Sequence, residues 1–261
     1  MLDGMNDDPQ EHRLSDAQLA EALALTRDAD SVELKLTIPD SQRRTTVAAL
    51  EIDPLDAQIR QVYFFDTPDL ALDAHGLVVR ARRTQGRDDD TVVKARPVIP
   101  TQVPPEVRRS KNLVVEVDTM PGGFVCSASM KGTVPAGHVK EAISGKRQLR
   151  KIYSKEQRAF FNAHAPDGIE LDDLSVLGPI TVLKLKFSPT GYAGKMVGEL
   201  WFYPDGSHIV ELSTKTPPAN AFQAAAEAKA FLVSRGVPLS GDQQTKTRTA
   251  LEFFSRELSA E

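Results

Sequence analysis

Charged residues recur two apart on five stretches with the composition of β-strands, and this spacing constrains the fold more than any other feature of the chain. A strand alternates its faces with period two, so each pair projects to one side while its apolar neighbours point to the other. Most half-buried strands keep their polar residues on the solvent side. Paired charges on five strands therefore indicate a closed or cupped sheet with a charged interior, suited to a polyanion and its metal ions. The five stretches are Glu33-Leu34-Lys35, Arg80-Ala81-Arg82, Lys94-Ala95-Arg96, Glu116-Val117-Asp118 and Lys184-Leu185-Lys186.

Composition narrows the class of protein. A chain of 261 residues can form two domains, but all-β barrels of this length are common as one. The net charge of -4, from 32 basic and 36 acidic residues, gives no overall electrostatic case for nucleic-acid binding. The single cysteine, Cys126, excludes an internal disulfide and fits a reducing compartment. No apolar run approaches the roughly 18 residues of a membrane helix, and the acidic N-terminus does not resemble a signal peptide. We therefore expect a cytoplasmic protein with neither a nucleic acid nor a membrane as its partner.

The order of the predicted elements favours one mainly β (α+β) domain. Residues 1–30 form an acidic N-terminal extension, disordered over 1–14 and then helical from Ser15, and the main domain spans 31–261. Gly86–Asp90 is expected to be a solvated hairpin loop. Helices are expected around 68–74, 137–150, 219–235 and 241–258, the last two outside the barrel or across one mouth. The whole predicts a single antiparallel β tunnel or barrel of about eight strands with peripheral helices. The expected strands are 31–38, 45–53, 59–66, 77–84, 91–98, 111–119, 158–162, 180–187, 197–203 and 207–215.

The segment 63–82 carries the most specific motif, and it reads YFFDTPDLALDAHGLVVRAR. Lys94 follows on the next expected strand, then the acidic pair Glu116 and Asp118, and Glu33-Leu34-Lys35 opens the series. This ordered series, spread over residues 31–235, resembles the CYTH superfamily, the triphosphate tunnel metalloenzymes. That superfamily includes class IV adenylate cyclases, thiamine triphosphatases, inorganic triphosphatases and fungal-type RNA triphosphatases.

The resemblance implies a tunnel in which basic residues hold phosphate and glutamates hold a metal ion. Lysines and arginines on several strands can grip a triphosphate together, and arginine can do so bidentately. Hard divalent ions such as Mg²⁺ or Mn²⁺ need carboxylate oxygens. Such an ion bridges phosphate oxygens, polarises phosphorus and orients a water for attack. The expected partner is a small-molecule triphosphate or polyphosphate, with Mg²⁺ or Mn²⁺ as cofactor.

Counting faces along the expected strands, together with the resemblance, assigns the candidate site. Glu116 and Glu33 are the candidate catalytic residues. The candidate metal ligands are Glu33, Glu116, Asp118 and Glu211. The candidate phosphate-binding residues are Lys35, Arg80, Arg82, Lys94, Arg96, Arg158, Lys184, Lys186 and Lys215.

Four positions depart from the acidic pattern of the superfamily. Ser31 stands at the first glutamate of the opening motif, Lys184 and Lys186 stand where many members have two glutamates, and Ser213 replaces the second acid of a late pair. These replacements preserve anion binding and weaken metal binding.

Several functions stay open at this point. The first is a metal-dependent triphosphatase or an enzyme like the class IV adenylate cyclases. The alternative is a catalytically weak or inactive module that binds a polyanion or nucleotide. A docking role has only the terminal helices to support it. The sequence does not choose the organic group on the triphosphate, nor the oligomeric state.

Overall fold

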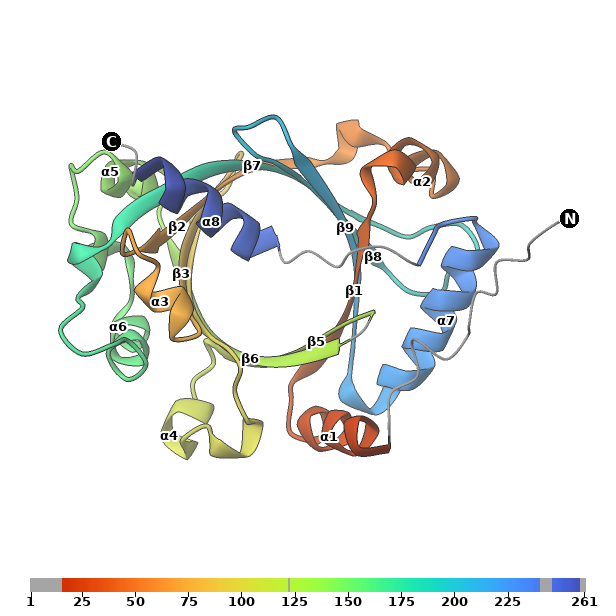
Figure 1. Cartoon of the computed structure of the whole chain (residues 1–261), viewed down its shortest axis with the longest axis horizontal. Helices are drawn as coiled ribbons and strands as arrows, with labels where there is room; N and C mark the ends of the chain where they lie inside the picture. Colours follow the sequence, from red (N-terminus) through yellow and green to blue (C-terminus); the bar gives the residue numbers. More distant parts are fainter. Residues whose placement is uncertain (1–15, 122, 240–245, 259–261) are drawn as a thin grey trace, which may run out of the picture.

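A closed barrel dominates the computed structural model, which describes residues 16–121, 123–239 and 246–258 (Figure 1). Within these residues nine strands hydrogen-bond in the order β1-β5-β6-β4-β3-β2-β7-β8-β9, and β9 closes the ring on β1. The predicted segment 1–14 lies outside the described residues. The strands are β1 (Ser31–Ile38), β2 (Gln58–Asp66), β3 (Leu77–Thr84), β4 (Asp89–Ala95), β5 (Leu113–Met120), β6 (Gly123–Val134), β7 (Ser175–Phe187), β8 (Met196–Phe202) and β9 (His208–Thr216).

The sheet is mixed, which differs from the antiparallel barrel that the sequence predicts. Strands β1 and β5 pair in parallel, with Glu33 opposite Asp118, whereas the other neighbouring pairs are antiparallel. The extra strand is β6, which runs through a segment that gave no strand signal. Its glycines, serines and alanines have low β-propensity, so pairing with β4 and β5 decides its conformation.

Two predicted strands are helices. Residues 45–53 fall largely in α2 (Arg43–Ala49), in which Thr46 is buried despite the strand preference of β-branched residues. Residues 158–162 fall in α6 (Lys155–Asn162). There Ser154 and Gln157 form a capping box that starts the helix, a signal readable in the sequence.

Helices cover the outside of the barrel and one helix lies across its opening (Figure 1). Outward-facing residues such as Val79, Val93 and Val115 form a core with side chains of α3, α5 and α6. A second outer core joins Leu36 and Val210 to α7. None of the described helices is long and apolar enough to cross a membrane. The remaining helix bounds are α1 (Asp16–Arg27), α3 (Ala71–Ala74), α4 (Pro105–Arg108), α5 (His138–Ile143), α7 (Ala221–Ser234) and α8 (Lys246–Leu258).

Helix α8 packs against the inward face of the barrel rather than its outside. Leu251 and Phe254 contact Phe64, Val78 and other apolar residues that point into the lumen from β2, β3, β7 and β8. The sequence predicts that the last two helices lie outside the barrel or across one mouth. Helix α8 lies across one mouth, and α7 lies outside. The lumen therefore has an apolar part that α8 fills and a charged part that it leaves to the strands.

Local structure around the 63–82 motif positions the lumen strands. The Asp66 carboxylate accepts hydrogen bonds from the backbone N–H groups of Thr67, Leu72 and Asp73, at 2.7, 2.9 and 3.0 Å, and so fixes the turn between β2 and β3. Gly76 follows with a φ of +71°, where a Cβ would overlap the carbonyl oxygen of Arg96. The motif thus holds β3 and the end of β4 in register.

Candidate anion-binding site in the barrel lumen

Strand register brings the charged pairs of the sequence onto one face. Residues directly opposite each other in neighbouring strands share a face, so register alone identifies the lumen side. Glu33 lies opposite both Asp118 of β5 and Lys215 of β9, and Val78 lies opposite Lys94. Beyond β9 in the ring, Glu199 of β8 lies opposite both Lys184 of β7 and Glu211 of β9. The charges therefore gather in one enclosed space.

An acidic cluster forms where β1 runs parallel to β5. Oxygens of Glu33, Glu116 and Asp118 lie within 4.8 Å of one another. Two serines at positions where the sequence analysis expected acids by resemblance donate hydrogen bonds to this cluster. They are Ser31, 3.1 Å from Glu116 Oε1, and Ser213, 3.0 Å from Glu33 Oε1. The replacements thus orient the remaining carboxylates.

Lysines neutralise this acidic cluster from three strands. Lys35 Nζ lies 3.0 Å from Asp118 Oδ1 and 3.5 Å from Glu33 Oε2, Lys94 Nζ lies 3.3 Å from Asp118 Oδ2, and Lys215 forms an ion pair with Glu116. Burial opposes ionisation of Asp118, but Lys94 and Lys35 outweigh it and hold the pKa of this carboxyl below its ordinary value. The Asp118 carboxylate therefore stays charged at neutral pH.

A cluster of arginines on β2 and β3 lies beside these lysines. Arg82 Nε is 2.8 Å from Asp90 Oδ1, and Arg60 Nη2 donates to Gln58 at 2.9 Å. The Arg80 side chain makes no hydrogen bond or ion pair to another described residue, and its Nε is buried without a partner. Burial, and then the neighbouring Arg82, lower the pKa of Arg80 to about 10. Asp90 and Glu199 offset these effects only in part, and an anion in direct contact with Arg80 would compensate its charge.

A third charged group joins α8 to strands β7, β8 and β9. Lys246 Nζ forms an ion pair with Glu199, lies 2.7 Å from Glu211 Oε1 and stands 4.9 Å from the ring centre of Trp201. Lys184 Nζ lies 2.6 Å from the other oxygen of Glu199. Burial disfavours charge on Lys246, but Glu199 and Glu211 outweigh it and raise the pKa of the ammonium group. Helix α8 therefore brings its own cation to this acidic pair.

Several predicted site residues occupy other places. Glu211 is separate from the acidic cluster of Glu33, Glu116 and Asp118, because it pairs with Lys246. Lys186 is exposed at the end of β7, and Arg96 follows β4, with Nη2 4.0 Å from Asp73. The predicted solvated loop is wrong at Asp90, which lies in β4 and pairs with Arg82.

The prediction that Arg158 lines the lumen from a strand is wrong. Arg158 lies on α6, and its guanidinium donates to the backbone oxygen of Tyr153 at 2.6 Å. Gln157 beside it donates to Thr91 O and Met130 O, whose residues face outward from β4 and β6. Helix α6 therefore packs on the outside of the barrel.

Among the described residues, four charged residues besides Asp90 face the lumen without having been predicted to do so. Arg60 lies two residues from Val62 and Glu199 lies two residues from Trp201, so each shares a strand face with an inward-facing residue. Neither has a charged neighbour two residues away, and the search for charged pairs therefore missed both. Lys131 belongs to β6, the strand without a signal. Lys246 lies on a helix, and nothing in its local sequence indicates that it reaches the lumen.

The two kinds of charge give the lumen a defined chemical capacity. The cations can hold several oxygens of one polyanion, and the acidic cluster presents hard oxygen donors next to them. A separate open cavity of about 770 Å³ lies beside the ends of β2 and β3, where Arg60, Arg83 and Arg87 line it together with Asp88 and Asp89.

Solved structures share this fold, although no family model and no curated protein sequence matches the chain. One is a candidate adenylate cyclase from Bacillus halodurans, with a TM-score of 0.58 and 14% identity over 84% of this chain and 97% of that one. Another, from Hippeastrum, is described as a candidate adenylyl cyclase with a dominant triphosphatase activity. Its TM-score is 0.64, with 14% identity over 85% of this chain and 95% of that one. The fold is therefore similar to the one that the sequence resemblance implies.

Proposed function

We propose that the barrel lumen binds the triphosphate group of a small molecule, and that the protein hydrolyses this group slowly with the help of a divalent ion. Arg80 carries the proposal, because this partly buried arginine forms no ion pair with another described residue, its Nε is buried without a partner, and it lies next to Arg60 and Arg82. A polyphosphate supplies the missing negative charge. The triphosphatase activity described for the Hippeastrum protein of the same fold supports this class of ligand.

The acidic cluster fits a hard divalent ion by the chemistry of its donors. Glu33, Glu116 and Asp118 offer carboxylate oxygens, and Mg²⁺ or Mn²⁺ takes a few such ligands together with waters and phosphate oxygens. A bound ion would supply Lewis-acid polarisation of the phosphorus and an oriented water. Lys35 and Lys94, which contact Asp118, would turn to the incoming phosphate oxygens. Arg80 and Arg82 would hold the remaining phosphates.

One observation favours binding without turnover as the second candidate function. The carboxylates of both acidic groups already have ammonium partners from the chain itself: Lys35, Lys94 and Lys215 for Glu33, Glu116 and Asp118, and Lys184 and Lys246 for Glu199 and Glu211. These cations repel a divalent ion and lower its affinity. A protein of this kind retains tripolyphosphate but releases little orthophosphate.

Calorimetric titration with tripolyphosphate, at fixed ionic strength, tests the binding claim. The substitution Arg80→Gln should weaken binding about 10- to 100-fold, because it removes charge-assisted hydrogen bonds worth about 1.5–3 kcal/mol. Arg109→Gln, on an exposed arginine after α4, is the matched control and should change nothing. Equal affinity of the Arg80→Gln variant and the unaltered protein would refute the lumen site.

Orthophosphate release separates the two candidate functions. Tripolyphosphate, thiamine triphosphate and ATP are each incubated with the protein, with and without Mg²⁺ or Mn²⁺. Metal-dependent release that Glu116→Gln abolishes, while tripolyphosphate binding persists, supports an enzyme. Binding without release from any of the three supports a binding module. Turnover near the 10 per second of a median enzyme would show that the internal lysines do not impede the metal.

A further inference from the structure

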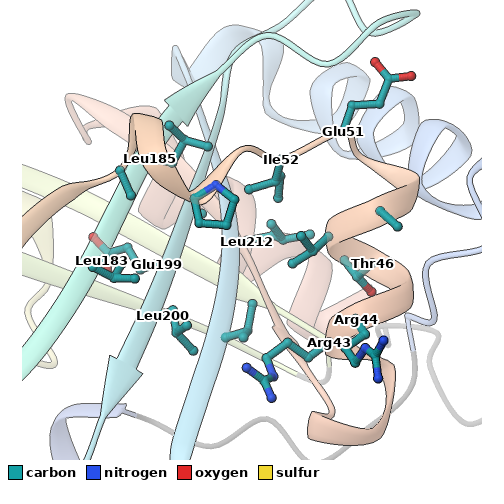
Figure 2. A pocket seen from close by; sticks show the side chains of 16 residues that line it. Arg43, Arg44, Thr46, Glu51, Ile52, Leu183, Leu185, Glu199, Leu200 and Leu212 are labelled. Carbon is teal, nitrogen blue, oxygen red and sulfur yellow. The ribbon is translucent and has the colours of Figure 1, made fainter.

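The outer wall of the barrel carries a pocket that the lumen chemistry does not use. Along β7, β8 and β9 the residues between the inward charges point outward, and several of them are leucine or valine. The segment with α2 and Pro54 covers this face without filling it, leaving a pocket of about 440 Å³ (Figure 2). This volume falls within the range of about 300–1,000 Å³ that is typical of small-molecule sites.

The lining of the pocket is apolar along most of its length. Leu183, Leu185, Leu200 and Leu212 come from the sheet, and Ile52 comes from the covering segment. Leu55, next to the lining residue Pro54, leaves 92% of its surface exposed, so apolar surface continues outside the pocket. Apolar surface of this kind favours an aliphatic ligand over a polar one.

Charge at the two ends of the pocket differs in sign. Figure 2 shows Arg43 and Arg44 together at one end and Glu51 at the other. Arg43 Nε lies 3.2 Å from Asp40, which compensates its charge. The exposed side chain of Arg44 makes no hydrogen bond or ion pair to another described residue. The Arg43 end therefore keeps one uncompensated positive charge, and a ligand with an anionic head would orient its head there.

We propose that this pocket binds a medium-chain alkyl carboxylate, with its carboxylate beside Arg44 and its chain along the leucines of β7, β8 and β9. The head group follows from the charge of the two ends, and the unbranched apolar chain follows from the lining. This site lies on the outside of the barrel, separate from the anion site in the lumen.

Gly198 of β8 offers a direct way to block the pocket. It lines the pocket, and a Cβ built there would meet only Leu212 and Phe187, each at the ordinary contact distance of 3.9 Å. A valine at this position enters the pocket without disturbing the backbone, and β-branched residues suit a strand. The substitution Gly198→Val should therefore fold normally and exclude the alkyl chain.

Calorimetric titration with octanoate, decanoate and dodecanoate, each below its micelle concentration, tests the proposal on the full chain. Affinity should rise about fourfold per added CH₂ until the pocket is filled. Gly198→Val should weaken dodecanoate binding more than tenfold and leave tripolyphosphate binding unchanged. Arg44→Gln should weaken dodecanoate binding about two- to fivefold, whereas the control Arg109→Gln should have no effect.

Each alternative occupant gives its own result. Decanol that binds as tightly as decanoate would overturn the anionic head group. Dodecanoate binding that saturating tripolyphosphate abolishes would move the ligand into the lumen and overturn the outer site. Sedimentation that shows a dimer dispersed by Gly198→Val would assign the pocket to a second copy of this chain. Undiminished dodecanoate binding by Gly198→Val would overturn the proposal outright.

Discussion

Replacing Lys246 with methionine should destabilise the fold by about 3 kcal/mol, because the change leaves two lumen carboxylates short of a cation. Removal of one partner from a buried ion pair costs about 3–5 kcal/mol. The side chains of Lys246, Glu199 and Glu211 are only 16%, 12% and 11% exposed. Lys184 still neutralises Glu199, but Glu211 has no other described cation within ion-pair distance. We therefore expect the lower end of that range, and methionine retains most of the aliphatic packing.

Thermal and urea unfolding measure this effect. A loss of about 3 kcal/mol corresponds to a fall in Tm of about 6–12 °C for a chain of this size. Lys229→Met, on an exposed lysine of α7, is the matched control and should stay within about 0.5 kcal/mol of the unaltered protein. The double substitution Lys246→Met/Glu211→Gln should recover most of the loss, since a neutral amide needs no cation. A loss below about 1 kcal/mol, or a double variant no more stable than the single one, would refute the reasoning.

Four further outcomes follow from the same contacts. Arg80→Gln should raise the unfolding free energy of the unliganded protein by up to about 1 kcal/mol in urea melts, because it relieves repulsion from Arg82. The pKa of Arg80 is lowered to about 10, and a bound anion should raise it again. Binding of tripolyphosphate near pH 10 should therefore be accompanied by proton uptake. Calorimetry in two buffers of different ionisation enthalpy measures this uptake. The pKa values of Glu33, Asp118 and Glu199 lie below their ordinary values near 4. The stability that these carboxylates contribute is therefore present above about pH 4 and is lost as the pH falls below it. Urea melts between pH 7 and pH 2 should show this loss, and the loss should be smaller in the Asp118→Asn variant. Gln157→Leu should cost about 2–4 kcal/mol in the same melts, because it leaves the buried carbonyls of Thr91 and Met130 without their side-chain donor, whereas Gln223→Leu on an exposed face of α7 should be neutral.

Period-two charge pairing was sufficient to predict a closed sheet with charges inside. Glu33, Arg80, Lys94 and Glu116 alternate with residues that the outer helices bury, and closure of the sheet then turns all of these charges inward. A sheet with one wet outer face would have shown the opposite arrangement. The local period-two pattern of the sequence therefore predicts the barrel.

Tertiary pairing decided the features that the sequence did not reveal. Strand β6 has a weak local preference, and it becomes a strand only because β4 and β5 offer it two edges. The predicted strand 158–162, and with it the lumen position of Arg158, is wrong because the Ser154 capping box starts a helix there. Lys246 contacts Glu211 although the two residues are 35 positions apart in the sequence, and a local sequence pattern cannot predict a contact over that separation.

A crystal structure of the protein with tripolyphosphate tests the central claim most directly. The account predicts phosphate density inside the barrel, with oxygens within hydrogen-bond distance of the Arg80 guanidinium and the terminal phosphate beside Lys35 and Lys94. Density only outside the barrel, or an Arg80 side chain that stays without an anion at saturating tripolyphosphate, would contradict it.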